Sequence, residues 1–452
     1  MRQLKRVSFI LELLISIFPL NGGKYAPGMS HTVLFTSAIW PEPMSSAAGV
    51  RTRFLIEAIR KLRPDWRVVM HASGKDTEFR GELERTLGVS CVQYLPNDES
   101  FDTFLRELQP SVVVFDRFML EEQFGWRVRE NAPRALRLLD TTDLHFLRWA
   151  REEQLQDPSS TFDFNSLEGE SKRDFFREIA AILRCDHSFV VSSFERDLLS
   201  GLPGFPAGRV SLLRWGVELA ETSHRSWEDR NHFVMIGNFR HPPNRDSVRW
   251  VKESLWPLVR AKLPRAELHV FGAYPAKQDM ELDCPREGFR VFGPWAGDAR
   301  ELLSRYRLLV APLRFGAGIK GKILDAWAAG TPAVTSPVGA EGMLEAGVAF
   351  PGPVLPVNET QAWADACVLL YESSGDWSAS REEGFSAIRR EYSPKAWAEA
   401  WIAKLESGLA QREAAEAQNW NWLSELLHQQ EQSAAKSLSR YIEVKEKLRL
   451  LQ

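Results

Sequence analysis

The residues best suited to chemistry lie in one short stretch, RFGAGIKGKILDAWAAG at positions 314–330. An apolar segment typical of a strand precedes it at residues 308–312, and another follows it at 332–336. The order predicts a strand, a glycine-bearing loop, a short helix that stops at a glycine, and a second strand. Free N–H groups and the positive end of the dipole at such a helix start favour anions. We therefore expect a phosphate-bearing ligand to bind at this turn.

Glycines, lysines and one carboxylate in this turn stand at positions that such a ligand needs. Gly316 and Gly318 let the backbone turn tightly and approach a ligand, and Lys320 and Lys322 add mobile positive charge. Asp325 lies one helical turn beyond Lys322, where its carboxylate could accept hydrogen bonds from ribose hydroxyls. Taken singly, each glycine could serve only a tight turn and each lysine only a solvated face. Their combination in one turn favours a nucleotide diphosphate.

A loop after the first predicted strand could face the same ligand. Small residues from Ser45 to Gly49 would let its backbone border a cleft. Arg51 or Arg53 could face an anionic group, or both could lie in the solvated first turn of a helix. The residue types leave these two readings open.

A second loop of the first half, LLDTTDLH at 138–145, carries candidate catalytic side chains. Asp143 and His145 could contact substrate or accept a proton from it. The alternative for an aspartate at such a junction is to cap the following helix. Asp116 and Arg117, after another apolar segment, form a weaker pair of the same kind.

Short apolar segments rich in β-branched residues alternate with helix-length segments along most of the chain, which is typical of parallel βαβ units. We predict an α/β fold of two Rossmann-like, doubly wound domains that face a cleft, with a C-terminal helical extension. Ligands of such sheets bind beyond the carboxyl ends of the strands, so the site should lie in the cleft. The predicted strands are 31–37, 66–72, 90–95, 111–116, 135–140, 187–192, 210–215, 232–237, 267–272, 290–293, 308–312 and 332–336.

The same pattern divides the chain into five parts. They are an N-terminal extension at 1–29, a first domain at 30–217, a polar linker at 218–231, a second domain at 232–392 and C-terminal helices at 393–452.

Two segments within these parts stand apart in composition. Residues 148–172 are polar and acidic, which indicates a mobile insertion. Residues 411–452 are rich in Ala, Glu, Gln, Lys and Leu, which predicts a long C-terminal helix.

Composition excludes several classes of protein. The 452 residues include 57 basic and 60 acidic side chains, and a net charge of -3 gives no drive toward nucleic acid. Apolar residues at 44% and charged residues at 26% are typical of a folded globular chain. Four widely spaced cysteines indicate reduced thiols, and nine histidines without metal-ligand spacing lead us to expect no metal site.

The N-terminal segment 1–29 allows several interpretations. Basic residues precede an apolar run at 9–20, which is too short to span a bilayer and lacks a small-x-small cleavage site after it. Met29 stands directly before the first strand, so the segment could also be a dispensable extension or an upstream-start artefact. We favour an extension or weak peripheral membrane contact over secretion, with a cytoplasmic location.

Three motifs of the second half stand out, namely FVMIGNFRHPPN at 233–244, the stretch 311–330 and TPAVTSPVGAEG at 331–342. Together they resemble the nucleotide-sugar-dependent glycosyltransferases of family 4 (group 1), which have the GT-B fold. The resemblance implies transfer of a sugar from a nucleotide-diphosphate donor with retention at the anomeric carbon. It implies no metal and no cofactor, since the nucleotide-sugar is a substrate, and it leaves open a glycan, lipid-linked or small-molecule acceptor.

In that family two glutamates separated by seven residues bind the donor. Asp325 matches the second, and Ala317 stands where the first would be. The resemblance makes the first domain the acceptor side and the second the donor side, and it places Trp295 near the nucleotide base. We expect Lys320, His145 and Asp143 to be catalytic. The expected donor-binding set is Gly49, Arg51, Asn238, Arg240, Trp295, Gly316, Gly318, Ile319, Lys320, Lys322 and Asp325.

Two other functions compete with transfer. Ala317 and the absence of a basic pair after the first strand of the second domain favour a catalytically weak or inactive GT-B-like protein that binds a nucleotide-sugar or a partner. A nucleotide-sugar 2-epimerase would share the architecture but needs acidic and basic groups around the sugar C2, which the sequence does not reveal.

Overall fold

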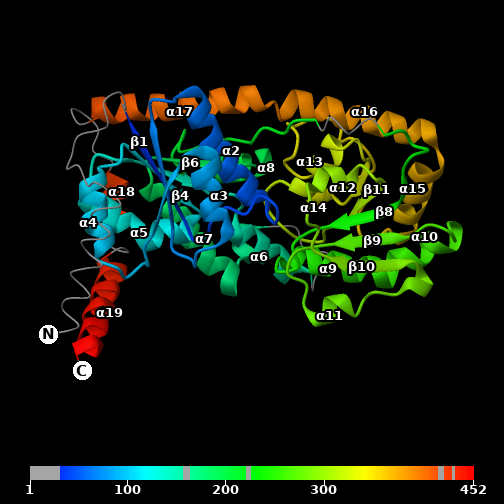
Figure 1. Ribbon diagram of the computed structural model, residues 1–452, viewed down its shortest axis with the longest axis horizontal. Coiled ribbons are helices and arrows are strands. Elements are labelled where there is room, and N and C mark those ends of the chain that lie inside the picture. The colour runs from blue at the N-terminus through cyan, green and yellow to red at the C-terminus, as the bar shows by residue number, and fades with distance from the viewer. Residues whose placement is uncertain (1–30, 156–162, 220–224, 416–421, 430–432, 452) are drawn as a thin grey trace.

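The structure is a computed structural model that describes residues 31–155, 163–219, 225–415, 422–429 and 433–451. It consists of two lobes that lie side by side, each built on one parallel sheet with helices packed on it (Figure 1). The predicted α/β architecture of two doubly wound units is confirmed. All twelve predicted strands are present, shifted at their ends by a few residues.

The first lobe has a seven-stranded sheet of order β3-β2-β1-β4-β5-β6-β7. Its central strands read as continuous apolar runs, because a parallel strand covered by helices is buried on both faces. The strands are β1 (Thr32–Ser37), β2 (Arg67–Ala72), β3 (Ser90–Gln93), β4 (Val112–Asp116), β5 (Leu136–Asp140), β6 (His187–Val190) and β7 (Val210–Leu212). The helices are α2 (Ala47–Leu62), α3 (Glu78–Leu87), α4 (Ser100–Leu108), α5 (Phe118–Asn131), α6 (His145–Gln154), α7 (Gly169–Arg184) and α8 (Ser193–Ser200).

The second lobe has a five-stranded sheet of order β10-β9-β8-β11-β12. The order changes direction between β8 and β11, which is the switch point at which such sheets bind ligands. The strands are β8 (Asn231–Ile236), β9 (Leu268–Phe271), β10 (Phe289–Gly293), β11 (Tyr306–Ala311) and β12 (Ala333–Thr335). The helices are α9 (Pro242–Trp250), α10 (Trp256–Lys262), α11 (Lys277–Met280), α12 (Ala299–Leu303), α13 (Gly321–Ala328), α14 (Pro337–Ala340), α15 (Thr360–Glu372) and α16 (Ser374–Glu391).

Helix α17 (Pro394–Ala415) follows α16 and returns to the first lobe. In Figure 1, α16 runs along the top of the second lobe and α17 along the top of the first. It packs against α2, where Trp401 is fully buried and donates a hydrogen bond to the carbonyl of Leu55 at 3.2 Å. Trp401, Ile402 and Leu405 belong to the apolar core on the α2 face of the first sheet. Helix α17, which follows the second lobe in the sequence, therefore completes the core of the first lobe.

Two expectations about helices are corrected. The segment 148–172 is in part the end of α6 and the start of α7, and its residues 156–162 lie outside the described residues. The expected single helix after residue 411 is replaced by the end of α17, by α18 (Trp422–Leu427) packed on α7, and by α19 (Ser433–Leu451). No helix among the described residues has the length and apolar character needed to cross a membrane. The segment 1–29 lies outside the described residues.

Candidate functional site

A cavity of about 440 Å³ lies between the two lobes. Its walls are the loops after β1, β4 and β5 of the first sheet and after β8, β9, β10 and β11 of the second. These loops meet there because all strands are parallel and end at the same edge of their sheet. The volume is within the range of small-molecule sites. The lining includes Asp143, Asn238, Arg240, Trp295, Gly316, Gly318, Ile319, Lys320, Lys322 and Asp325 of the expected site.

The turn between β11 and α13 has the predicted form. Gly316 and Gly318 have φ values of +144° and +65°, a backbone conformation that other residues rarely adopt. A Cβ at Gly318 would lie 3.0 Å from the Asp143 Cβ and 3.1 Å from the carbonyl oxygen of Thr142. A Cβ at Gly321 would lie 2.9 Å from the Cβ of Ala47. Gly318 and Gly321 therefore let the two lobes approach closely at the site.

One amide of this turn is already used by the protein itself. The N–H of Gly318 donates to Glu195 Oε1 at 2.8 Å, so it cannot belong to an anion site. Within the described residues the N–H groups of Gly321 and Lys322, at the start of α13, have no hydrogen-bond partner. The amides available to an anion in this turn are thus those at the start of α13.

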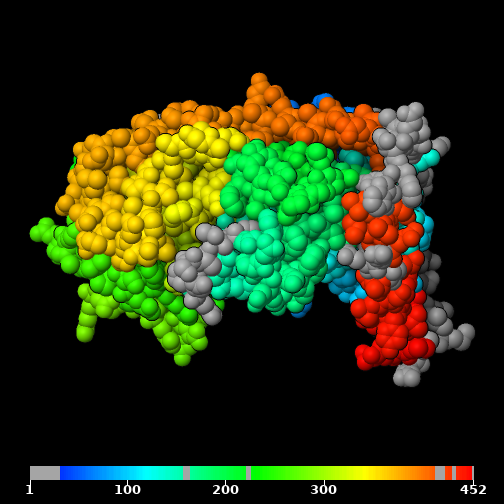
Figure 2. Space-filling view, turned by 180° about the vertical axis from the view of Figure 1, so that it is seen from behind, coloured from blue at the N-terminus to red at the C-terminus, as the bar shows by residue number. Residues whose placement is uncertain are grey.

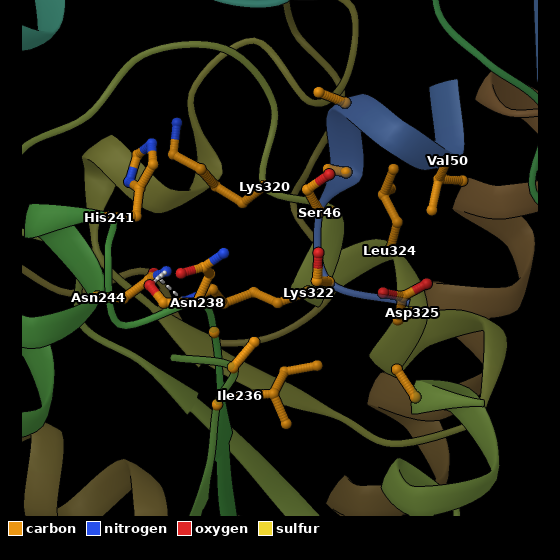
Figure 3. A pocket seen from close by; sticks show the side chains of 18 of the residues that line it. Ser46, Val50, Ile236, Asn238, His241, Asn244, Lys320, Lys322, Leu324 and Asp325 are labelled. Atoms are coloured by element: carbon orange, nitrogen blue, oxygen red, sulfur yellow. Dashed lines mark hydrogen bonds between the residues drawn. The ribbon is translucent and has the colours of Figure 1, made fainter. Parts of the chain in front are cut away.

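The ammonium group of Lys320 lies inside the turn. Its Nζ donates to the carbonyl oxygens of Gly318 at 2.6 Å and Ala317 at 3.1 Å. Burial lowers the pKa of Lys320 to about 8, although Glu341 opposes the shift. Figure 3 shows this side chain directed toward His241, a pocket residue that the sequence analysis did not select.

Lys322 is held by a neighbouring amide. Its Nζ donates to Asn244 Oδ1 at 2.6 Å, and Asn244 Nδ2 donates to the carbonyl of Asn238 at 2.9 Å (Figure 3). Burial and the charge of Lys320 together lower the pKa of Lys322 to about 7. Asn244 was not predicted, although it is the last residue of the motif at 233–244 that carries the family resemblance.

Asp325 lies across the pocket from Lys320 in Figure 3. Within the described residues its carboxylate accepts no hydrogen bond, and it lines the cavity. Burial raises the pKa of Asp325 to about 7, with Arg300 only partly opposing. A half-buried carboxylate without a partner is suited to ligand hydroxyl groups, which would supply the missing hydrogen bonds.

Aromatic and basic side chains cover the second-lobe wall of the pocket. Trp295 lines the cavity, and its indole Nε1 is buried without a hydrogen-bond partner among the described residues. The Arg240 guanidinium lies 3.8 Å from the centroid of the Tyr274 ring. Arg245, the other basic residue close to Arg240 in sequence, does not line the pocket, because it forms an ion pair with buried Asp279 at 2.9 Å.

Gly49 and Arg51 do not line the pocket, and their expected donor contacts are corrected. The guanidinium of Arg51 is buried, with Nε 2.8 Å from Asp140 Oδ2 and Nη1 donating to the carbonyl of Leu213 at 2.5 Å. It therefore joins α2 to the first sheet. Gly49 lies against Glu42, where a Cβ would come within 2.5 Å of the backbone. Arg53 pairs with Glu82 at 2.5 Å on the surface of the first lobe.

Asp143 lines the cavity. His145 does not line the cavity and lies next to Asp143. His145 Nε2 is 3.5 Å from Asp143 Oδ1, and the His145 ring packs edge-on against Phe118. Burial alone would raise the pKa of Asp143, but Arg148, His145 and Arg117 outweigh it and hold the pKa below its usual range. Burial lowers the pKa of His145 to about 4, although Asp143 opposes it. Asp143 is thus a fixed anion, and His145 is neutral near pH 7.

Contacts between the lobes at this site were not predicted. The carboxylate of Glu195, fully buried at the start of α8, accepts from the N–H of Leu144 at 3.0 Å as well as from Gly318. Arg151 forms two hydrogen bonds with Glu341 at 2.8 and 2.7 Å and a third with the carbonyl of Gly316 at 2.8 Å. The partners that join the two lobes are more than 100 residues apart, so no local pattern could have indicated them.

Comparison with family models finds a match for part of the second lobe. Residues 230–373 match the family model described as glycosyl transferases group 1. A sequence search finds no match among curated proteins. The second lobe therefore carries the sequence signature of group 1 glycosyltransferases.

Solved structures of similar fold cover most of the chain. HepE (Alr3699) of Anabaena, in complex with UDP and glucose, is 12% identical with a TM-score of 0.63, over 84% of this chain and 100% of that one. Sucrose-phosphate synthase of Thermosynechococcus elongatus is 15% identical with a TM-score of 0.59, over 85% and 100%. A glycosyltransferase of Rickettsia africae is 12% identical with a TM-score of 0.60, over 84% and 99%. The chain has the GT-B fold that the resemblance predicted.

Proposed function

We propose that the protein transfers a sugar from a nucleotide-diphosphate donor to an acceptor, with retention at the anomeric carbon and without a metal. The observation that carries this proposal is the arrangement in one cavity of a helix start, two lysines and, across the pocket, the Asp325 carboxylate. In the described part of the chain, neither the first amides of this helix nor the carboxylate has a hydrogen-bond partner. The group 1 match of the second lobe supports a nucleotide-sugar donor. Assignment to family 4 stays a prediction.

In this proposal the diphosphate lies at the start of α13. Bond breaking between the anomeric carbon and the phosphate oxygen leaves negative charge on the diphosphate. The N–H groups of Gly321 and Lys322 and the ammonium groups of Lys320 and Lys322 stabilise that charge. Asp325, one helical turn further on, binds the ribose hydroxyls. The indole N–H of Trp295, which has no partner among the described residues, donates a hydrogen bond to the base.

The acceptor hydroxyl must lose its proton as the new glycosidic bond forms. Asp143 is a weak base, because the charges of Arg148 and Arg117 stabilise its ionised form. The proton therefore moves to an oxygen of the departing phosphate, which is close to the bond that forms in a retaining reaction. Asp143 orients the acceptor by accepting a hydrogen bond, and His145 and Arg148 hold Asp143 in place.

The experiment that tests this function is titration calorimetry with UDP and GDP, followed by release of nucleotide from UDP-sugars and GDP-sugars. The HepE complex with UDP-glucose makes UDP the first probe. Binding of one nucleotide in the micromolar range and its release from a matching donor are the expected results. No binding of either nucleotide would contradict the proposal.

A non-catalytic relative that only binds a nucleotide-sugar is the second candidate. Ala317, in the position of the first family glutamate, favours it, because no carboxylate of this turn can contact the donor sugar there. Tight binding of UDP or GDP without release of nucleotide from any donor, even with a range of sugar acceptors, would establish this candidate.

A further inference from the structure

Helix α19 is attached to the first lobe by its polar face. The guanidinium of Arg127 on α5 is fully buried, donates to Ser439 Oγ at 3.1 Å and pairs with Glu443. Arg127 also pairs with Asp102 of α4 at 2.7 Å. A buried cation needs such partners, because an unpaired charge away from water is costly. Ser439 and Glu443 thus fix which side of α19 faces the protein.

Ion pairs along both edges of this contact hold the same orientation. Arg440 reaches Asp102 at 2.6 Å and Lys447 reaches Glu99 at 2.6 Å. Lys436 pairs with Glu130 of α5. The basic residues on this side of α19 therefore have carboxylates of the first lobe as partners.

The opposite face of α19 is apolar and exposed. Leu438, Tyr441, Val444 and Leu448 are 61%, 63%, 56% and 57% exposed. Their spacing of three or four residues puts them on one side of the helix, and we call them the outer stripe. Helices of globular proteins normally turn such a stripe toward a core. Figure 2 shows α19 projecting beyond the rest of the first lobe.

Positive charge accompanies the outer stripe. Lys445 and Arg449 lie on the same side of the helix, and in the described part of the chain neither has an ion-pair partner. Residues 433–451 carry five basic and two acidic side chains. Three of the basic side chains pair with the first lobe, which leaves Lys445 and Arg449 together with exposed Glu446. Of the two acidic residues, Glu443 is buried against α5. The exposed side of α19 is thus apolar and cationic.

We propose that the outer stripe of α19 docks the protein on a membrane surface that contains anionic lipid. Four apolar side chains would enter the boundary between headgroups and acyl chains, and Lys445 and Arg449 would contact lipid phosphates. Association of two copies through the stripe is disfavoured, because it would bring unpaired Lys445 and Arg449 side chains of both copies together. This inference is independent of the nucleotide site and goes beyond the proposed function.

The test is sedimentation of the full chain with vesicles of phosphatidylcholine and phosphatidylglycerol in equal parts, against phosphatidylcholine alone. We expect binding to the anionic vesicles that weakens at high salt. Leu438→Ser with Leu448→Ser, and separately Lys445→Glu with Arg449→Glu, should each weaken it at least roughly tenfold. Matched controls are Leu369→Ser, which is 54% exposed on α15, and Lys277→Glu on α11, which should leave it unchanged.

Three results would overturn the proposal. The wild-type chain could fail to bind the anionic vesicles, or the two double variants could bind as well as wild type while retaining its melting temperature. Light scattering could also show a dimer that Leu438→Ser with Leu448→Ser dissociates, which would assign the stripe to a second copy. A chain that starts at Met29 should still bind. If it loses binding while the α19 variants keep it, the preceding residues are the anchor.

Discussion

Lys320 and Lys322 have lowered pKa values and face a cavity suited to an anion. A bound diphosphate favours the charged form of each lysine and raises its pKa. Between pH 7 and the pKa that each lysine has in the complex, the complex therefore carries more protons than the free protein. The affinity for the nucleotide must then fall as pH rises through this range. The same linkage makes binding a proton-uptake reaction.

We predict uptake of about one proton when UDP or GDP binds near pH 8, because both lysines are partly neutral in the free protein. Calorimetry in two buffers of different ionisation enthalpy measures this number. Binding with proton release, or an affinity that rises between pH 7 and pH 9, would contradict the charge assignment.

Lys320→Ala should reduce turnover by about 2 to 4 kcal/mol of transition-state stabilisation, because the leaving diphosphate loses its buried cation. Lys322→Ala is the companion variant and should mainly weaken nucleotide binding, since Lys322 is already held by Asn244. Steady-state kinetics with the donor identified above separates the two effects. An unchanged kcat in a folded Lys320→Ala protein would remove the catalytic role of this lysine.

Asp325→Asn should weaken nucleotide affinity more than Asp325→Glu, because the amide offers one acceptor oxygen and no charge to ribose hydroxyls. The raised pKa of Asp325 adds a pH signature: wild-type affinity should approach that of Asp325→Asn below about pH 7, where the carboxyl is protonated. Equal calorimetric affinities of wild type and both variants at pH 8 would exclude the ribose contact.

At the scale of elements, the turn from β11 to α13 depends on a carboxylate from the other lobe. Burial raises the pKa of Glu195 to about 7, and its ionised form in turn favours the charged form of Lys320. One oxygen, Oε1, accepts from both lobes, and Oε2 is buried without a partner in the described structure. Glu195 thus joins the two lobes at the site and favours the charged form of Lys320.

Glu195→Gln keeps the shape and one acceptor oxygen, and it mimics the protonated acid. Its UDP or GDP affinity should therefore match wild type at pH 6 and fall below it, by up to about tenfold, at pH 8, where the wild-type carboxylate is ionised. A merely structural role would instead give the same loss at both pH values. Calorimetry at pH 6 and 8 distinguishes these outcomes.

The elements could be predicted because their signals are local. Apolar β-branched runs mark all twelve strands, and the glycines between β11 and α13 mark the turn. What could not be predicted depends on contacts between distant segments. Arg51 was expected in the site, yet its guanidinium is buried because it donates hydrogen bonds to Asp140, 89 residues away in the sequence. Glu195 and Arg151 reach the site only once the two lobes have come together.

At the scale of the whole molecule, α17 joins the lobes through the side chains it buries against α2. Trp401→Ala should lower the free energy of unfolding by about 3 to 5 kcal/mol, because it leaves a large cavity in a core that both helices share. Denaturant unfolding measures the change. Lys395→Ala, an exposed position at the start of α17, is the control and should change stability by less than about 0.5 kcal/mol.

The return of α17 also determines when the first lobe can be finished during synthesis. Its seven strands leave the ribosome by residue 212, but Trp401, Ile402 and Leu405 follow about 190 residues later. At about 5 to 20 residues per second, the nascent lobe waits roughly 10 to 40 s with an apolar strip of α2 uncovered. A truncated polypeptide that stops near residue 217 would keep that strip open and should aggregate or recruit a chaperone.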